Sequence, residues 1–325
     1  MTSTTRGVAT STTSSQSAPA IGIVNGLFLM LLAMLLAPLI DVFSKLATET
    51  TSPTMITAAR FFVQALCMLP IVLWLGLWRH FSWRMTVYHA IRAAIVTLSM
   101  ICFVAALAVM PVADAIAIFF VEPMILTILA SIFLGETIGW RRYTACGVGF
   151  LGAMIVIRPS FQELGLVAVL PVITAFCVAI FALMTRALAS RENPWAMQFQ
   201  MALWGVPICA ILLFFGDWSD FGFLIPSIPD FVTTSFLVGV GFFAALSGIL
   251  SVYAYRAAPA SVLAPMQYFE IVSATVFGWL VFADFPDAVK WLGISIIVGS
   301  GLYIIWREHS VAAKPLTVAD TTVAP

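Results

Sequence analysis

Long apolar runs follow one another along almost the whole chain, and they limit the fold more than any other feature. A helix needs about 20 mostly apolar residues to cross the hydrocarbon core of a bilayer. Of the 325 residues, 62% are hydrophobic and 9% are charged, whereas soluble domains carry about 25% charged residues. The runs are too long and too continuous for the strands of a membrane barrel. The sequence therefore predicts an all-α membrane protein.

Ten such runs predict ten transmembrane helices joined by short connections. The expected spans are residues 21–46, 53–77, 88–110, 113–134, 142–158, 164–187, 194–215, 231–255, 260–283 and 288–306. A Ser/Thr-rich segment at residues 1–20 precedes them, and a short polar segment at residues 307–325 follows them. The first of these segments has the composition of a disordered tail.

Basic residues are distributed unevenly between the two sides of this topology. Cytoplasmic connections of membrane proteins carry an excess of Lys and Arg. With the N-terminus in the cytoplasm, ten basic residues fall on the cytoplasmic side and three on the other, while Arg60 and Arg92 lie inside spans. This bias predicts that both termini are cytoplasmic, and it favours an even number of spans. We expect a multi-pass protein of the plasma membrane.

Two stretches of the chain, residues 108–143 and 256–291, resemble one another at a constant separation of 148 residues. In this register Glu122 of the fourth span aligns with Glu270 of the ninth span. An acidic residue also follows each of these spans. The alignment predicts that the chain contains an internal repeat.

The repeat divides the chain into two halves of five spans each, residues 21–158 and 164–306. Because five is odd, the second half enters the membrane from the opposite side. This predicts two inverted-topology repeats related by an axis in the membrane plane, an arrangement common in secondary transporters. The loop GETIGWRRY has two arginines, whereas its counterpart ADFPDAVKW has one lysine and two aspartates, as opposite orientations require.

The two aligned glutamates lie near the middle of their spans. At about 1.5 Å per residue, Glu122 and Glu270 are each roughly 14 Å deep. A charge at the bilayer centre costs about 2.5–3.5 kcal/mol on insertion scales, so such residues are functional candidates by default. Pro123 also removes a backbone donor beside Glu122.

The two glutamates are candidates for substrate binding and for proton coupling, because burial disfavours a charged carboxylate. A structural role is the alternative for each of them: Glu122 could bind the backbone that Pro123 disturbs or pair with an arginine, whereas Glu270 has no proline beside it, which makes a structural role a weaker alternative there.

Other polar side chains share helical faces with each other or with these positions. Gln267 lies three residues before Glu270 and therefore on the same face. Arg60 and Gln64 share a stripe of the second span, where Arg60 either binds an anionic substrate group or pairs with Glu122. These residues extend the candidate site beyond the two glutamates.

Two further intramembrane charges are interpreted as structural. Arg92 lies near the cytoplasmic end of the third span, and we expect its guanidinium to extend to the interface. Asp41 and Lys45 lie four residues apart at the outer end of the first span, and we expect a local ion pair.

Several classes of function find no support in the sequence. There is no nucleotide-binding GxxxxGK[ST] motif, and the five cysteines show no metal-ligand spacing. The net charge is zero, and no basic patch suggests a nucleic acid. We expect no histidine inside a span, which argues against an intramembrane enzyme. The sequence therefore predicts neither an enzyme nor a cofactor, a metal or a nucleic-acid partner.

Several motifs together resemble the EamA type of the drug/metabolite transporter superfamily. They are the mid-span EP at Glu122, the FLGE ending at Glu136, the GVGFLGAMIVI of the fifth span and the ITAARFF of the second. The second half departs from the pattern, because Ile271 follows Glu270 in place of proline. The resemblance implies alternating access through a central cavity lined by spans one to four and six to nine, with spans five and ten peripheral.

Aromatic residues on the spans that would line this cavity could stack on a flat substrate. The candidate substrate-binding residues are Glu122, Glu270, Gln267, Arg60, Gln64, Tyr268, Tyr253 and Trp204.

These features favour a secondary transporter that moves a small polar or amphiphilic metabolite, driven by the substrate gradient or by protons. The alternative is a flippase for lipids or amphiphiles whose cavity opens laterally between helices. The expected partners are a small-molecule substrate and the lipid bilayer, and the chain could assemble as a homodimer. The resemblance implies a bacterial inner membrane. The substrate, the direction of transport and the coupling stay open.

Overall fold

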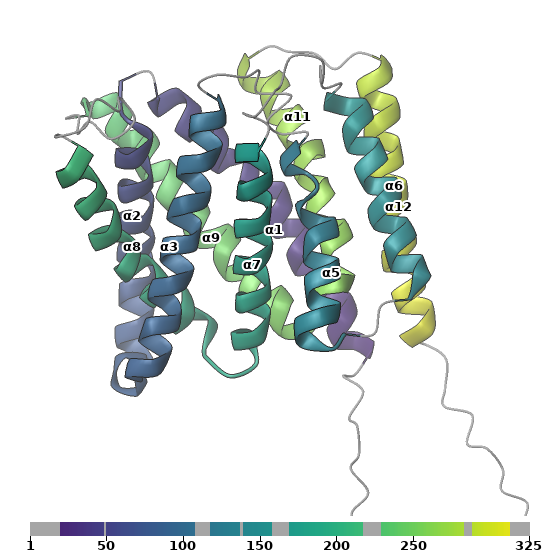
Figure 1. Ribbon diagram of the computed structural model, residues 1–325, viewed down its shortest axis with the longest axis horizontal. Coiled ribbons are helices and arrows are strands. Elements are labelled where there is room, and N and C mark those ends of the chain that lie inside the picture. The colour runs from purple at the N-terminus through teal and green to yellow at the C-terminus, as the bar shows by residue number, and fades with distance from the viewer. Residues whose placement is uncertain are drawn as a thin grey trace, which may run out of the picture.

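The computed structural model describes residues 20–48, 50–107, 118–136, 139–157, 169–216, 229–282 and 288–312. Within these ranges, the regular structure consists of helices that pack side by side as one bundle (Figure 1). The predicted tails lie largely outside the described residues. The same holds for residues 108–117, which contain the end of the predicted third span and the start of the fourth.

The helices follow the predicted spans closely along the chain. Their bounds are α1 Ala20–Ala47, α2 Pro53–Trp74, α3 Trp83–Leu107, α5 Glu122–Leu134, α6 Trp140–Ile157, α7 Val169–Ala189, α8 Pro194–Gly216, α9 Phe231–Ala257, α10 Ala260–Leu263, α11 Phe269–Phe282 and α12 Ala288–Ala312. Two 3-10 segments accompany them, η1 (Leu77–His80) and η5 (Ala264–Tyr268). The predicted ninth span thus consists of α10, η5 and α11.

Among the residues that the structure describes, seven helical stretches are long and apolar enough to cross a membrane. Three shorter apolar helices accompany them, at Glu122–Leu134, Tyr143–Ile155 and Trp291–Tyr303. The predicted class, an all-α multi-pass membrane protein, is confirmed, and the count of ten spans stays a prediction.

Short polar signals begin and end several helices. Ser52 caps α2 by accepting a backbone N–H, and Pro53 occupies the first turn, which needs no amide donor. Asp230 caps α9 by accepting the N–H of Thr233 at 3.0 Å, and hydrogen bonds from Thr233 lower the pKa of Asp230. Gly135 ends α5 at a φ of 64°, in the left-handed region that favours glycine.

The packing of the helices follows the predicted repeat. α1 packs against α9 and α11, α2 against α8 and α9, α3 against α7 and α8, α5 against α7, and α6 against α12. The predicted repeat makes α1 equivalent to α7, α2 to α8, α3 to α9, α5 to α11 and α6 to α12. When each helix is replaced by its equivalent, the same set of pairs results. For example, α1–α9 becomes α7–α3, and α1–α11 becomes α7–α5. A two-fold relation between the halves would produce this pattern among the most extensive contacts, and the inverted repeat stays a prediction.

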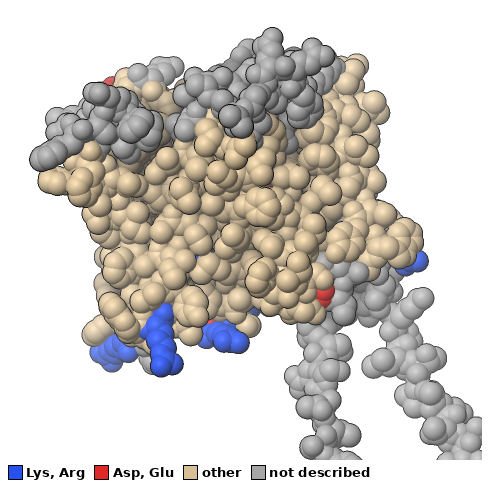
Figure 2. Space-filling model, in the orientation of Figure 1, with Lys and Arg blue, Asp and Glu red and all other residues tan. Residues whose placement is uncertain are grey.

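The two edges of the bundle differ in charge. α1 begins and α12 ends at the same edge, the lower one in Figure 1. Lys and Arg side chains gather along this edge in Figure 2, while the band above it shows neither Lys nor Arg on the visible face. A band without basic residues above a basic edge is the surface expected of a protein embedded in a bilayer. We refer to the lower edge as the basic edge.

A close approach between α2 and α9 depends on glycine. A β-carbon added at Gly241 of α9 would overlap with the β-carbon of Val63 and would lie 3.1 Å from the carbonyl oxygen of Arg60. The carbonyl oxygen is part of the backbone of α2, and the β-carbon is bonded directly to it. A change of side-chain rotamer therefore cannot move either atom away. This contact holds α2, which carries Arg60, against the second half of the chain.

We predict that Gly241→Ala destabilises the protein by about 1–3 kcal/mol, because the added methyl group forces α2 away from α9. The matched control is Gly278→Ala on α11, where no described residue lies within 4 Å of the added atom. The control should keep the stability of the wild type or raise it slightly, since alanine favours the helix. Thermal unfolding of the detergent-purified proteins measures both effects. An unchanged melting temperature for Gly241→Ala would contradict the packing of α2 on α9.

Candidate functional site

The fourth predicted span is interrupted directly before its glutamate. α5 begins at Glu122, after two residues in a turn. Pro123 has no N–H, and the N–H groups of Met124 and Ile125 both donate to the carbonyl oxygen of Val121 at 3.1 Å. The regular hydrogen-bond ladder is therefore disturbed at the predicted position.

The equivalent span of the second half is broken by a different proline. η5 separates α10 from α11, and Pro265 within η5 cannot donate to the ladder. Glu270 consequently lies in the first turn of α11, as Glu122 lies in the first turn of α5, although Ile271 rather than proline follows it. A carboxylate in the first turn of a helix is stabilised by the helix dipole. Both glutamates thus lie where the backbone supports negative charge.

Glu122 contacts the second half of the chain directly. Its Oε1 accepts a hydrogen bond from Nε2 of Gln267 at 3.4 Å, and 2% of the residue is exposed. The Oε1 atom of Gln267 is buried and has no partner among the described residues. Because an unpaired buried acceptor costs free energy, this atom is a position that a donor group of a ligand would satisfy.

Four ionisable residues on four helices are linked one to the next by electrostatic interactions, and we call them the charged row: Arg60, Asp41, Glu270 and Glu122. Arg60 on α2 interacts electrostatically with Asp41 on α1. Glu270 on α11 interacts with both Asp41 and Glu122. Exposure falls along the row, from the exposed Asp41 through the half-buried Glu270 to the buried Glu122. The row therefore connects an accessible carboxylate with a buried one.

Asp41 faces the interior of the bundle rather than lipid. It lies seven residues after Met34 and eleven after Met30, on the same helical face. Met30 is buried, and Met34 packs against the same apolar core. Asp41 also has partners on α2 and α11. Its local pair with Lys45 stays a prediction.

Arg60 has a different partner from the one expected. The acid beside it is Asp41 rather than Glu122, so the expected pairing with Glu122 is corrected. The Nε atom of Arg60 is buried and has no hydrogen-bond partner among the described residues. The guanidinium of Arg60 therefore keeps a donor for an acceptor group at this site.

Gln64 lies one turn from Arg60 and forms a second polar contact between the halves. Its Nε2 lies 3.5 Å from the acceptor Oε1 of Gln198 on α8, and its own Oε1 is buried without a partner among the described residues. Gln198 passes close to Gly248 on α9, where a β-carbon would overlap with Nε2 of Gln198. Gln198 escaped the sequence analysis because it lies outside the aligned stretches of the repeat.

The three predicted aromatic residues do not come together. Tyr268 is fully buried against Gly149 of α6, and its ring centroid lies 6.1 Å from that of Phe120. Tyr253 and Trp204 are partly buried, and each packs against a different apolar cluster. Tyr268 therefore packs toward α6, and stacking of a substrate on any of the three stays a prediction.

Sequence reasoning missed a buried polar network near the start of α3. Nε2 of His89 lies 2.8 Å from Oε2 of Glu192, and Nδ1 of His89 lies 3.1 Å from Nη1 of Arg92. Arg92 also donates to Oγ1 of Thr185 at 2.8 Å and lies 4.9 Å from the centre of the Phe181 ring. Arg92 and His89 are fully buried.

This network corrects two expectations. Arg92 does not extend to the interface, because its guanidinium is held between α3 and α7. A histidine does enter a helix that is long and apolar enough to span, since His89 belongs to α3. The spacing of three residues between His89 and Arg92 places both on one helical face, and this was the available signal.

Glu136 fastens the two halves together at the other end of α5. Its two carboxylate oxygens accept the N–H groups of Ala260 and Ser261 at 3.0 Å each. Oγ of Ser261 donates to the same carboxylate at 2.7 Å, and Nε of Arg186 lies 3.5 Å from it. Arg186 also donates to the carbonyl oxygen of Tyr255. We call Glu136, Arg186, Ala260 and Ser261 the latch.

The sequence contained a signal for the latch that was not used. The repeat places Asp284 at the position equivalent to Glu136, so both halves have a carboxylate after this span. Asp284 itself lies outside the described residues.

We predict that Asp41 and Arg60 are energetically coupled, so that changing both costs less than the sum of the single changes. Asp41→Asn leaves the cation of Arg60 without its neighbour, and Arg60→Gln leaves Asp41 facing Glu270, so each should destabilise the protein. The double variant should recover about 0.5–3 kcal/mol of that loss. Unfolding of the four proteins under one condition measures the coupling. Additive effects would contradict the electrostatic interaction between the two residues.

The sequence matches the EamA-like transporter family over residues 24–158 and 165–306. The riboflavin transporter of Vibrio cholerae is 28% identical over 268 residues, which cover 82% of this chain and 87% of that protein. The S-adenosylmethionine uptake transporter of Rickettsia bellii is 26% identical over 297 residues, which cover 90% of this chain and 97% of that protein. These relatives are named transporters and not enzymes.

A solved crystal structure shares the fold. Its TM-score is 0.74 at 15% sequence identity, and the match covers 88% of this chain and 98% of the other. The likeness at this identity concerns the fold alone. Because the family matches both halves of the chain, from residue 24 to residue 306, this protein belongs to the EamA-like transporter family.

Proposed function

We propose that this protein is a secondary transporter of a small polar or amphiphilic metabolite in the plasma membrane. Two inverted repeats of five spans, residues 21–158 and 164–306, would form the two sides of the transport path. The exchange symmetry of the helix contacts supports this division. The basic edge would then face the cytoplasm, with both termini on that side.

The observation that carries the proposal is the charged row at the interruptions of two spans. Irregular backbone at membrane depth is tolerated where it is buried in protein or lines a water-filled path. Glu122 and Glu270 adjoin such interruptions and interact with one another. The row draws its members from both halves, so a substrate that binds there would contact both repeats.

The asymmetry between the two ends of the bundle supports alternating access. The latch closes the gap between α5, α7 and α10 at the basic edge. Asp41, which lies toward the other edge, is exposed. We infer that this conformation faces outward, and that opening to the cytoplasm requires the latch to separate. The 3-10 geometry of η5 offers a hinge for that movement.

The charges of the row restrict the chemical groups that a substrate can present to it. The row contains three carboxylates and one guanidinium, so it favours a group with a positive charge or several hydroxyl donors. The sulfonium and ammonium groups of S-adenosylmethionine have the first property, and the ribityl chain of riboflavin has the second. These two compounds, which appear in the names of the relatives, are the first probes to test.

Proton coupling remains part of the proposal. Glu122 and Glu270 interact electrostatically, and two charged carboxylates repel one another. A proton on either residue would remove this repulsion, and a cationic substrate would do the same. Protons and substrate could therefore compete for the same pair of carboxylates, which is one way to exchange them across a membrane.

We predict that Glu136→Gln loosens the latch, because the amide loses the charge-assisted bonds to Arg186 and to the first turn of α10. The amides of Ala260 and Ser261 should exchange with deuterium at least several times faster, and the stability should fall by about 1–3 kcal/mol. The control is Asp230→Asn, which removes a capping charge at the opposite edge. Unchanged exchange of these amides in Glu136→Gln would contradict the latch.

We predict that a transported metabolite raises the melting temperature of the purified protein, because it binds the folded state. The panel begins with riboflavin and S-adenosylmethionine and extends to nucleosides, vitamins and amino acids. Glu270→Gln should weaken the binding of a cationic compound about tenfold. Glu192→Gln makes the same chemical change in the network of His89, away from the charged row, and should leave the affinity unchanged.

The outcomes of this screen separate the alternatives. Equal weakening in both variants would contradict a site at the charged row. Stabilisation by phospholipids and by no metabolite of the panel would favour the flippase over the metabolite transporter.

A further inference from the structure

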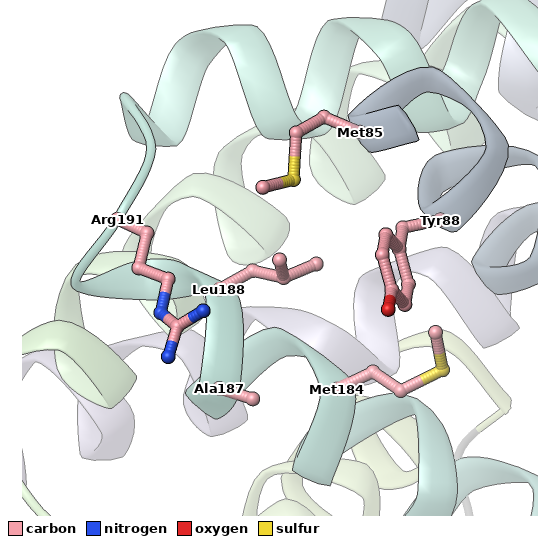
Figure 3. Close-up of a pocket in the computed structure, with 6 residues that line it drawn as sticks. All are labelled: Met85, Tyr88, Met184, Ala187, Leu188 and Arg191. Carbon is pink, nitrogen blue, oxygen red and sulfur yellow. The ribbon is translucent and has the colours of Figure 1, made fainter. Parts of the chain in front are cut away.

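A groove opens between α3 and α7 at the basic edge of the bundle. Its volume is about 200 Å³, and Figure 3 shows six side chains around a common space: Met85, Tyr88, Met184, Ala187, Leu188 and Arg191. None of these residues belongs to the charged row or to the latch. The groove is therefore a separate feature of the surface.

One end of the groove is charged and the other is apolar. Arg191 lies just beyond the end of α7 and is exposed, and no carboxylate of the described residues forms an ion pair with it. The adjacent Glu192 is instead bound to His89 at 2.8 Å. Met184 lies seven residues before Arg191, which corresponds to about 10 Å along the helix. Between these two ends, the buried Leu188 contributes an apolar wall.

The opposite side of the groove is amphipathic. Tyr88 is 49% exposed, and it enters the space from α3, opposite Arg191 (Figure 3). Tyrosine is enriched at the boundary between lipid and water, where its ring is in lipid and its hydroxyl is hydrated. Met85 lies near the start of α3, and methionine side chains adapt to flexible apolar partners.

We propose that this groove binds one anionic phospholipid. The phosphate would pair with Arg191 and accept a hydrogen bond from Tyr88, and an acyl chain would lie along Leu188 and Met184. The position favours a lipid over a soluble anion, because the charged group lies at the helix ends while the rest of the groove is apolar. The lipid would contact α3 of the first half and α7 of the second half.

The test is native mass spectrometry of the delipidated, full-length protein with phosphatidylglycerol or phosphatidylcholine of identical acyl chains. Phosphatidylglycerol should bind more tightly. Arg191→Gln should weaken its binding about fivefold, the change that corresponds to roughly 1 kcal/mol for one basic residue near an anionic headgroup. Arg141→Gln is the matched control, since it removes an exposed arginine on α6 that does not line the groove.

A second variant tests the apolar part and guards against misfolding of the first. Ala187→Phe keeps Arg191 and fills the groove, and it should weaken the binding of phosphatidylglycerol at least as much. Both variants are compared with the wild type by melting temperature in the same detergent. If Arg191→Gln does not fold, the binding of phosphatidylglycerol to Ala187→Phe tests the proposal in its place.

Any one of three results in the binding measurements would overturn the proposal. They are equal binding of the two lipids, equal losses in Arg191→Gln and Arg141→Gln, and unchanged binding in a folded Ala187→Phe. Competition by soluble glycerol phosphate at the concentration effective for the lipid would also overturn it, because the acyl chain would then contribute nothing.

Discussion

A carboxylate in the hydrocarbon core has no water around it, and the arrangement of this protein depends on how that cost is met. Glu122 lies in the first turn of α5 and accepts a hydrogen bond from Gln267. Gln267 belongs to the second half of the chain. The buried carboxylate is therefore supported across the two halves, at the place where we propose that a polar substrate binds.

The charged row and the latch are connected by two structural elements. α5 carries Glu122 at its start and Glu136 just after its end, and its 13 residues correspond to about 20 Å. In the second half, Ser261 of the latch and Glu270 of the row belong to the same broken span, on either side of η5. The proposed substrate site and the latch at the basic edge therefore share these two elements. The lipid groove on α3 and α7 lies outside this connection.

Much of the fold could be predicted from the sequence, because each helix that crosses a bilayer needs a long apolar run, and such runs are visible in the sequence. The repeat also placed Glu122 and Glu270 at equivalent positions, and the structure adds that the helix is interrupted before each of them, beside Pro123 and at Pro265. The partners of charged residues could not be predicted in the same way. Arg60 was expected either to bind an anionic substrate group or to pair with Glu122, and the acid that interacts with it electrostatically is Asp41.

The network around Arg92 and the latch were missed for the same physical reason. Hydrophobicity determines which segments enter the membrane, but the pairing of polar side chains depends on which helices become neighbours. Arg92 donates to Thr185 on α7, 93 positions along the chain, and Glu136 accepts the N–H of Ala260 at the start of α10, 124 positions along. Glu136 stood out in the sequence through the FLGE motif and through the equivalent Asp284, but neither signal identified its partners.

Counterflow in proteoliposomes tests the central claim most directly. Vesicles that contain the purified protein are loaded with an unlabelled compound, and the entry of the same labelled compound is followed without any added energy source. Our account predicts that at least one metabolite of the riboflavin or S-adenosylmethionine type accumulates transiently, and that Glu122→Gln with Glu270→Gln greatly reduces this uptake. Uptake no faster than that of protein-free vesicles for every such compound would contradict it.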